Sequence, residues 1–188
     1  PQALGRYIAQ LKAPGVQAAS IEENVSGEAD PSSENEAIAI IGMACRFPGE
    51  ASTTEELWEQ LSEGTDAIRS VPKNRWSTPP EEAYLSQGGF IEDIAGFDSG
   101  FFELSPKEAI SLDPQQRWLL EVTWEALEHA GIAPRTLHGS QTGVFVGISH
   151  ADYAHRLDMD QRLHEKGYIG TGNAHFTAAG RLSYFLGI

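Results

Sequence analysis

The chain has 188 residues and 40% hydrophobic residues, which is enough to bury one core. Its 13 basic and 27 acidic side chains give a net charge of −14, which disfavours nucleic acid or an anionic membrane as a partner. Cys45 is the single cysteine, so no internal disulfide can form and a reducing cytoplasm is expected. The sequence shows neither a bilayer-spanning apolar run nor a signal peptide.

The first 36 residues divide into a short helix and a linker. Apolar side chains at helical spacing predict a helix over 2–12, which ends at the breaker pair Pro14-Gly15. Residues 16–36 hold six acidic side chains and no basic one, the composition of a flexible, self-repelling linker. We therefore expect three parts: a helix in 1–13, a linker over 14–36 and a folded domain over 37–188. The chain lacks an initiator Met, so we expect it to be a piece of a longer polypeptide.

The first half of the expected domain begins with a strand and a helix. The continuous apolar run 38–43 predicts a strand buried on both faces. Thr53 and Glu56 have the spacing of a capping box, which predicts a helix that ends at Gly64. The Pro-rich, polar stretch 71–87 is typical of a long surface loop.

Two more helix starts and a second strand follow. Ser105-Pro106 with Glu108 predicts one helix, and Asp113-Pro114 predicts a longer one to about residue 130. Alternating side chains over 144–148 predict a second buried strand, and helices are expected within 151–166 and over 177–185. Strands mixed with helices in this order indicate an α/β fold.

Three features could carry chemistry, and each has a simpler interpretation. Cys45 could be a nucleophile, but a buried structural cysteine is favoured. His150, Asp152 and His155 could bind a metal, but the histidines are five residues apart instead of four, which favours a solvated helix. The Gly-rich stretch 170–173 suggests a nucleotide loop, but it lacks the third glycine of the dinucleotide fingerprint.

Three blocks of sequence resemble one enzyme family. They are AIAIIGMACRFPG at 37–49, FFELSPKEAISLDPQQRWLLEVTWEALEHAGI at 101–132 and TGVFVGIS at 142–149. In this order they are similar to a β-ketoacyl synthase (ketosynthase) domain of a modular type I polyketide synthase. The resemblance covers 37–188, under half of a complete domain, and implies an α/β, thiolase-like fold of which this chain holds an incomplete N-terminal half. It also implies that helix 1–13 is the end of a preceding acyl carrier protein, and an arbitrary amphipathic helix is the alternative.

The resemblance implies an acyltransferase that performs a decarboxylative Claisen condensation of an acyl thioester with a malonyl-type extender. The family's nucleophilic cysteine and two histidines follow a segment similar to GRLSYFLGI, so they are expected beyond Ile188. We therefore assign no catalytic residue, and the chain alone is expected to be inactive. Gly172 and Asn173 are the substrate-side candidates, because the similar family segment lies near the acyl site and the dimer contact; loop geometry is the alternative for both.

The same resemblance sets the expected partners. No cofactor or metal is expected to bind directly, and the phosphopantetheine arm of a partner acyl carrier protein would deliver the acyl group. The acyltransferase domain of the same module and a second ketosynthase copy in a homodimer are the other implied partners, in polyketide or fatty acid biosynthesis. The alternatives are a non-catalytic interaction or docking module and an unrelated binding protein.

Overall fold

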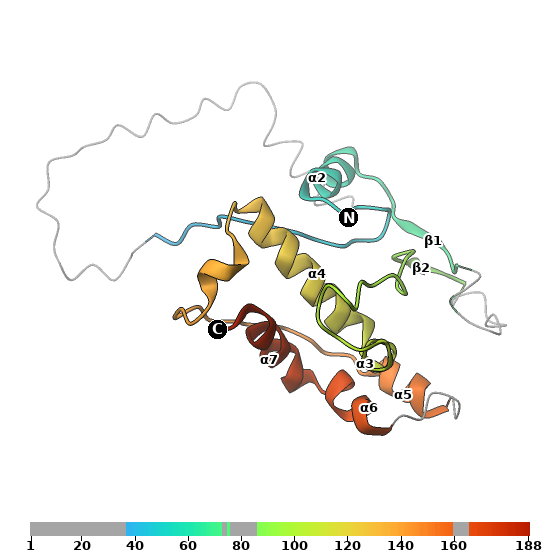
Figure 1. Ribbon diagram of the computed structural model, residues 1–188. Helices are drawn as coiled ribbons and strands as arrows, with labels where there is room; N and C mark the ends of the chain where they lie inside the picture. The colour runs from blue at the N-terminus through green and yellow to red at the C-terminus, as the bar shows by residue number, and fades with distance from the viewer. Residues whose placement is uncertain (1–36, 73–74, 76–85, 160–165) are drawn as a thin grey trace, which may run out of the picture.

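The computed structural model describes residues 37–72, 75, 86–159 and 166–188 (Figure 1). The predicted helix 2–12, the linker and most of the loop 71–87 lie outside the described residues. The elements in chain order are α2 (Thr54–Glu63), β1 (Ile68–Ser70), β2 (Gln87–Gly89), α3 (Pro106–Ser111), α4 (Pro114–His129), the 3₁₀ helix η2 (Pro134–Leu137), α5 (Asp152–Met159), α6 (Lys166–Asn173) and α7 (His175–Leu186).

The predicted helix starts are confirmed by their capping contacts. The Thr53 hydroxyl accepts from the Glu56 backbone N–H, and the Glu56 carboxylate accepts from the Thr53 N–H, which closes the capping box of α2. The Ser105 hydroxyl accepts from the Glu108 N–H at the start of α3, and the Asp113 carboxylate accepts from the N–H of Gln115, the second residue of α4. Each cap satisfies backbone donors that the helix itself cannot satisfy, so the sequence sets these boundaries locally.

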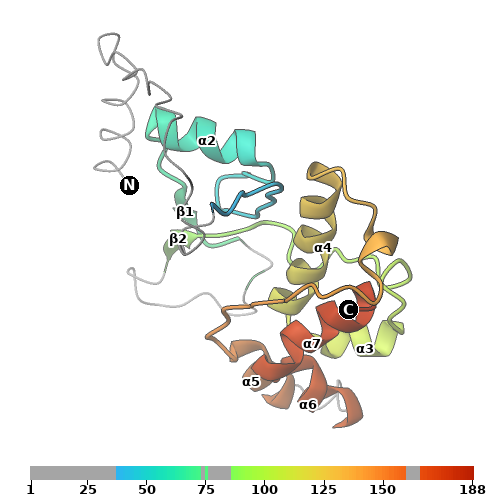
Figure 2. The ribbon, with the colours of Figure 1, turned by 90° about the vertical axis from the view of Figure 1, so that its left-hand side faces the viewer.

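The core lies between α4 and α7, which pack side by side in both views (Figures 1 and 2). Phe102, Leu112, Leu120 and Leu182 form its buried centre. Aromatic rings extend it, because the Phe102 and Phe185 ring centroids lie 5.0 Å apart. Helices α3, α5 and α6 gather at the N-terminal end of α4, below the core in Figure 1.

The two predicted buried strands, 38–43 and 144–148, are not strands in the structure. Both run as extended chain, and the side chains of Ile38 and Phe145 are 96% and 97% exposed. Val144 and Val146 do pack against the core, so the predicted alternation is correct on one face only. A strand needs hydrogen-bonded neighbours, and within the described residues the only sheet is the antiparallel pair β1–β2, which lies elsewhere in the chain.

The extended segment that follows residue 37 lies against α4. A side chain at Gly42 would overlap the Ala126 carbonyl oxygen and the Ala130 methyl group, so only glycine allows this close approach. The Arg46 guanidinium forms an ion pair with Glu125 of α4 and donates to the Ser52 carbonyl oxygen. Contacts with α4 therefore position a segment that has no strand pairing of its own.

Candidate functional site at the α6–α7 corner

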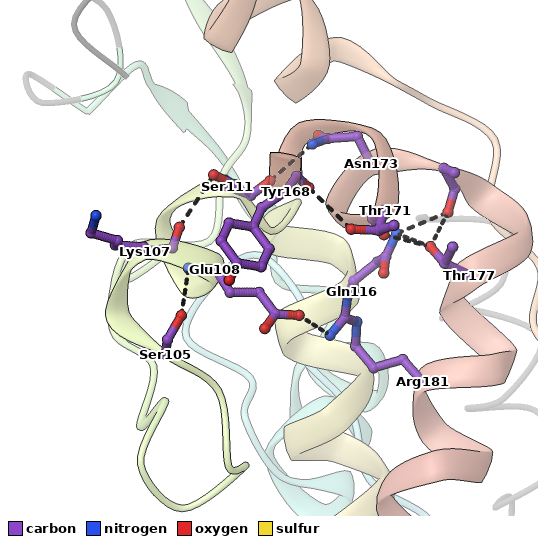
Figure 3. A network of polar contacts seen from close by, with 11 residues as sticks. Ser105, Lys107, Glu108, Ser111, Gln116, Tyr168, Thr171, Asn173, Thr177 and Arg181 are labelled. Atoms are coloured by element: carbon purple, nitrogen blue, oxygen red, sulfur yellow. Dashed lines mark hydrogen bonds and ion pairs between the residues drawn. The ribbon is translucent and has the colours of Figure 1, made fainter. Parts of the chain in front are cut away.

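Helices α6 and α7 meet at a sharp corner that contacts the turn between α3 and α4 (Figure 3). Only Ala174 separates the two helices, and its backbone N–H donates to the Gly170 carbonyl oxygen at 3.1 Å. The Gly-rich stretch 170–173 is therefore helical, which contradicts its alternative interpretation as a nucleotide loop. Both sequence-predicted substrate residues lie in this corner.

Asn173 is buried, with 7% of its surface exposed. Its Nδ2 donates to the carbonyl oxygens of Ser111 and Ile169, each at 2.9 Å. The first of these bonds joins residues 62 positions apart and holds α6 on the end of α3. The Asn173 Oδ1 atom is also buried and has no hydrogen-bond partner among the described residues.

Gly172 makes the closest backbone approach of the corner. Its carbonyl oxygen accepts from the Asp113 N–H at 3.0 Å, at the start of α4. A Cβ atom at this position would lie 2.6 Å from the Ser111 carbonyl oxygen. The structure thus gives Gly172 and Asn173 a clear packing role, while their predicted contact with substrate stays a prediction.

Gln116 and Thr177 complete the polar cluster from the other side. Gln116 is 1% exposed, and its Nε2 donates to the Ala174 carbonyl oxygen at 3.1 Å and to the Thr177 hydroxyl at 3.4 Å. Its Oε1, like Asn173 Oδ1, is buried without a partner in the described part of the chain. A buried acceptor left unpaired costs about 1–3 kcal/mol, so these two oxygens oppose the stability that the other bonds of the cluster supply.

A groove of about 740 Å³ runs beside this corner, between α7 and the α3–α4 region. Phe102, Leu104, Leu120 and Phe185 contribute apolar side chains to its lining. Arg181 Nη1 and Glu108 Oε1 form an ion pair of 2.8 Å in the wall, with side chains only 14% and 22% exposed. The groove can hold an apolar group, and Glu103 and the Arg181–Glu108 pair add charged groups to its lining.

The sequence did not indicate that Gln116, Arg181 or Glu108 belongs to the site, and Glu108 was noted only as part of a helix start. The Asp113-Pro114 pair indicated only a helix start. The available signal was that Gln116 lies one helical turn before the apolar residues Leu119 and Leu120. The partners Arg181 and Glu108 lie 73 residues apart, and no local pattern connects them.

The other sequence candidates stay outside the corner. Burial raises the pKa of the half-buried Cys45 thiol, with a smaller opposing effect of the Arg46 charge, and a raised pKa reduces the thiolate fraction that a nucleophile needs. No group of three or more His, Cys, Asp or Glu side chains suited to a metal occurs in 37–72, 75, 86–159 and 166–188. His150 contacts α4 through its backbone, because its carbonyl oxygen accepts a hydrogen bond from Gln115 Nε2.

Comparisons with known proteins identify close similarities. Residues 35–188 match the family model described as beta-ketoacyl synthase, N-terminal domain. The chain is 50% identical over 155 residues to erythronolide synthase EryA3 of Saccharopolyspora erythraea, covering 81% of this chain and 5% of that protein. It is 40% identical over 195 residues to a phenolphthiocerol/phthiocerol polyketide synthase of Mycobacterium tuberculosis, covering 98% of this chain and 11% of the relative.

A solved structure agrees with the sequence matches. The ketosynthase from module 6 of the bacillaene synthase from Bacillus subtilis superposes with a TM-score of 0.69 at 36% identity, over 81% of this chain and 25% of that one. The expected thiolase-like α/β fold is thereby confirmed, for the N-terminal part of such a domain. The chain spans about a tenth or less of the curated relatives named above. Every helix in the described residues is too short or too polar to cross a bilayer.

Proposed function

Because the chain belongs to the β-ketoacyl synthase family, we propose that it is the front part of a ketosynthase that extends polyketide chains. The reaction is the decarboxylative condensation of an acyl thioester with a malonyl-type extender on an acyl carrier protein. The observation that carries this proposal is the match of four-fifths of the chain to a ketosynthase structure at 36% identity. The polyketide synthases among its relatives support the substrate class.

The chemistry would use residues that follow Ile188. A cysteine thiolate there attacks the acyl thioester on a carrier's phosphopantetheine arm and releases the carrier thiol. Two histidines assist loss of carbon dioxide from the extender, and the resulting carbanion attacks the enzyme-bound thioester. The cysteine leaves as the thiolate, and the β-ketoacyl product stays on the carrier. Backbone N–H groups stabilise the oxyanions.

The α6–α7 corner would support this chemistry from one side. Gly172 and Asn173 would lie near the acyl site, with Asn173 held in place by its hydrogen bond to the Ser111 carbonyl oxygen. Gly172 would keep the corner seated on α4. A homodimer, the acyl carrier protein and the acyltransferase domain of the same module are the proposed partners. The reaction would take place in the cytoplasm, with no directly bound cofactor.

Acylation of the full polypeptide that carries this sequence tests the proposal. It is incubated with an acyl thioester of N-acetylcysteamine, and intact mass with peptide mapping locates the acyl group. We expect one acyl group on a cysteine beyond Ile188, followed by its transfer to malonyl-loaded carrier protein.

Cys45→Ser is the matched control and should acylate like the unmodified protein, because Cys45 is half-buried and its thiol pKa is raised. Acylation that is lost with Cys45→Ser would contradict the assignment. A polypeptide that binds carrier protein without becoming acylated would favour the alternative, a docking module.

A further inference from the structure

The side chain of Gln116 reaches from α4 to the break between α6 and α7 (Figure 3). One proton of its Nε2 is donated to the carbonyl oxygen of Ala174, the residue that separates the two helices, at 3.1 Å. The other is directed at the Thr177 hydroxyl, which lies 3.4 Å away. These bonds join residues 58 and 61 positions apart, so they attach the α6–α7 corner to α4 across the fold.

The Ala174 carbonyl oxygen does not need Gln116 for its own pairing. The backbone N–H of Thr177 lies 3.2 Å from it and the Thr177 hydroxyl 2.6 Å from it. The same hydroxyl lies 2.8 Å from the Thr171 carbonyl oxygen of α6. These contacts stay within 171–177, so they fix the shape of the break but not its place on α4.

Burial of Gln116 brings little net stability. The residue is 1% exposed, and its Oε1 has no hydrogen-bond partner within the described residues. A methionine would fill the same space without that unpaired acceptor, which offsets the loss of the two Nε2 bonds. The particular effect of Gln116 is on position, because the core around Leu120 and Leu182 holds the later part of α7, whereas Gln116 fixes where α7 begins.

The corner has another attachment at the turn between α3 and α4. There Asn173 Nδ2 donates to the Ser111 carbonyl oxygen, and the Gly172 carbonyl oxygen accepts from the Asp113 N–H. A corner held at that turn alone can tilt about it, whereas the tie from Gln116 fixes its orientation as well. A displacement of about 1 Å in a reacting complex can lower the rate about 100-fold.

We propose that Gln116 is a positioning residue for acyl transfer. It sets where α7 begins on α4, and it thereby orients the surface of the α6–α7 corner that an acyl thioester meets. Thr177 acts with it, because its hydroxyl contacts both Gln116 and the Ala174 carbonyl oxygen. The inference rests on the proposed ketosynthase function and adds to it the residues that hold the corner in place.

Gln116→Met in the full polypeptide tests the proposal through three measurements. The first is the second-order rate constant for acylation by the butyryl thioester of N-acetylcysteamine. The second is the rate at which iodoacetamide, a small reagent that needs no acyl-binding surface, alkylates the same cysteine. The third is the Tm. We expect acylation to slow about tenfold, between the effects of one lost hydrogen bond and of a 1 Å displacement. Alkylation should be unchanged, and the Tm should move by no more than about 2–4 °C.

Three further variants separate position from other causes. Thr177→Ser keeps the hydroxyl and should acylate like the unmodified protein, whereas Thr177→Val removes it and should slow acylation as Gln116→Met does. Gln60→Met is the matched control. Gln60 of α2 also donates to a backbone carbonyl oxygen, that of Gly49, so this variant loses a similar bond away from the corner and should acylate at the normal rate.

Two results would overturn the proposal. One is an equal acylation rate in Gln116→Met and the unmodified protein. The other is a parallel loss of acylation, alkylation and Tm, because this would mean that Gln116 only supports the fold. An unmodified polypeptide that is never acylated on a cysteine beyond Ile188 would contradict the proposed function itself, and this inference with it.

Discussion

Replacing Gly172 with alanine should weaken the contact between the α6–α7 corner and the start of α4. The new Cβ would lie 2.6 Å from the Ser111 carbonyl oxygen and 3.2 Å from the Leu112 Cα. Both atoms belong to the backbone, so no flexible side chain can move aside. The α6–α7 corner must instead move away from the backbone of Ser111 and Leu112. This movement also lengthens the hydrogen bond from the Asp113 N–H to the Gly172 carbonyl oxygen.

The expected magnitude follows from three contributions. Overpacking costs about 1–3 kcal/mol, and the weakened backbone bond costs about 0.5–1.5 kcal/mol. Alanine in a helix stabilises by up to about 1 kcal/mol relative to glycine. The free energy of unfolding should therefore fall by about 0.5–4.5 kcal/mol. Gly170→Ala in the same helix meets no atom within 4 Å and should raise that free energy by up to about 1 kcal/mol.

Thermal unfolding of the full polypeptide with each variant is the assay. A change of 1 kcal/mol moves the Tm of a domain of this size by about 2–4 °C. We expect Gly172→Ala to lower the Tm and Gly170→Ala to leave it unchanged or raise it. Equal Tm values for the two variants would refute the close approach of Gly172 to the α3–α4 turn.

Three further predictions concern charge and exposed surface. Burial raises the pKa of Glu121, so its charged form destabilises the fold. Glu121→Gln should therefore increase the free energy of unfolding at pH 7. This gain should vanish at low pH, where acid protonates the native carboxyl, and urea titrations at several pH values would show it. Arg181→Ala and Glu108→Ala should each cost about 1.5–3 kcal/mol, and a double-mutant cycle with additive losses would mean that the ion pair contributes nothing. Residues 36–188 expressed alone should aggregate or lack fixed packing because the side chains of Ile38 and Phe145 are exposed, so a sharp, cooperative thermal transition of a monomer would contradict this expectation.

Local signals in the sequence predicted the starts of α2, α3 and α4, whereas α6 was missed because its glycines suggested a loop. The capping box of Thr53 and Glu56, the cap at Ser105 and the αL glycine at Gly64 all satisfy backbone groups within a few residues of themselves. Such contacts depend on neighbours in the chain, which the sequence displays directly. The family resemblance could also be seen in the sequence, because it rests on long blocks in a fixed order, and the family match confirmed it.

Contacts between distant residues could not be predicted. The apolar pattern of 38–43 is typical of a strand, but a strand also needs a paired neighbour, and the pattern does not supply one. In the candidate site, too, single residues could be predicted but the contacts between distant residues could not. Asn173 was found by resemblance, while its bond to Ser111 and the cluster around Gln116 arise only when α6 reaches the α3–α4 turn.

The wide sequence separation of α4 and α7 has a consequence during synthesis. Leu120 of α4 is covered by a core to which Leu182 of α7 belongs, so its apolar face cannot be fully buried until the later helix has left the ribosome. At about 5–20 residues per second, the interval between the two helices lasts roughly 3–12 s. During that time the nascent chain presents an uncovered apolar helix. A chaperone that binds apolar segments at the ribosome should therefore hold nascent chains that end between α4 and α7, and release them once α7 is complete.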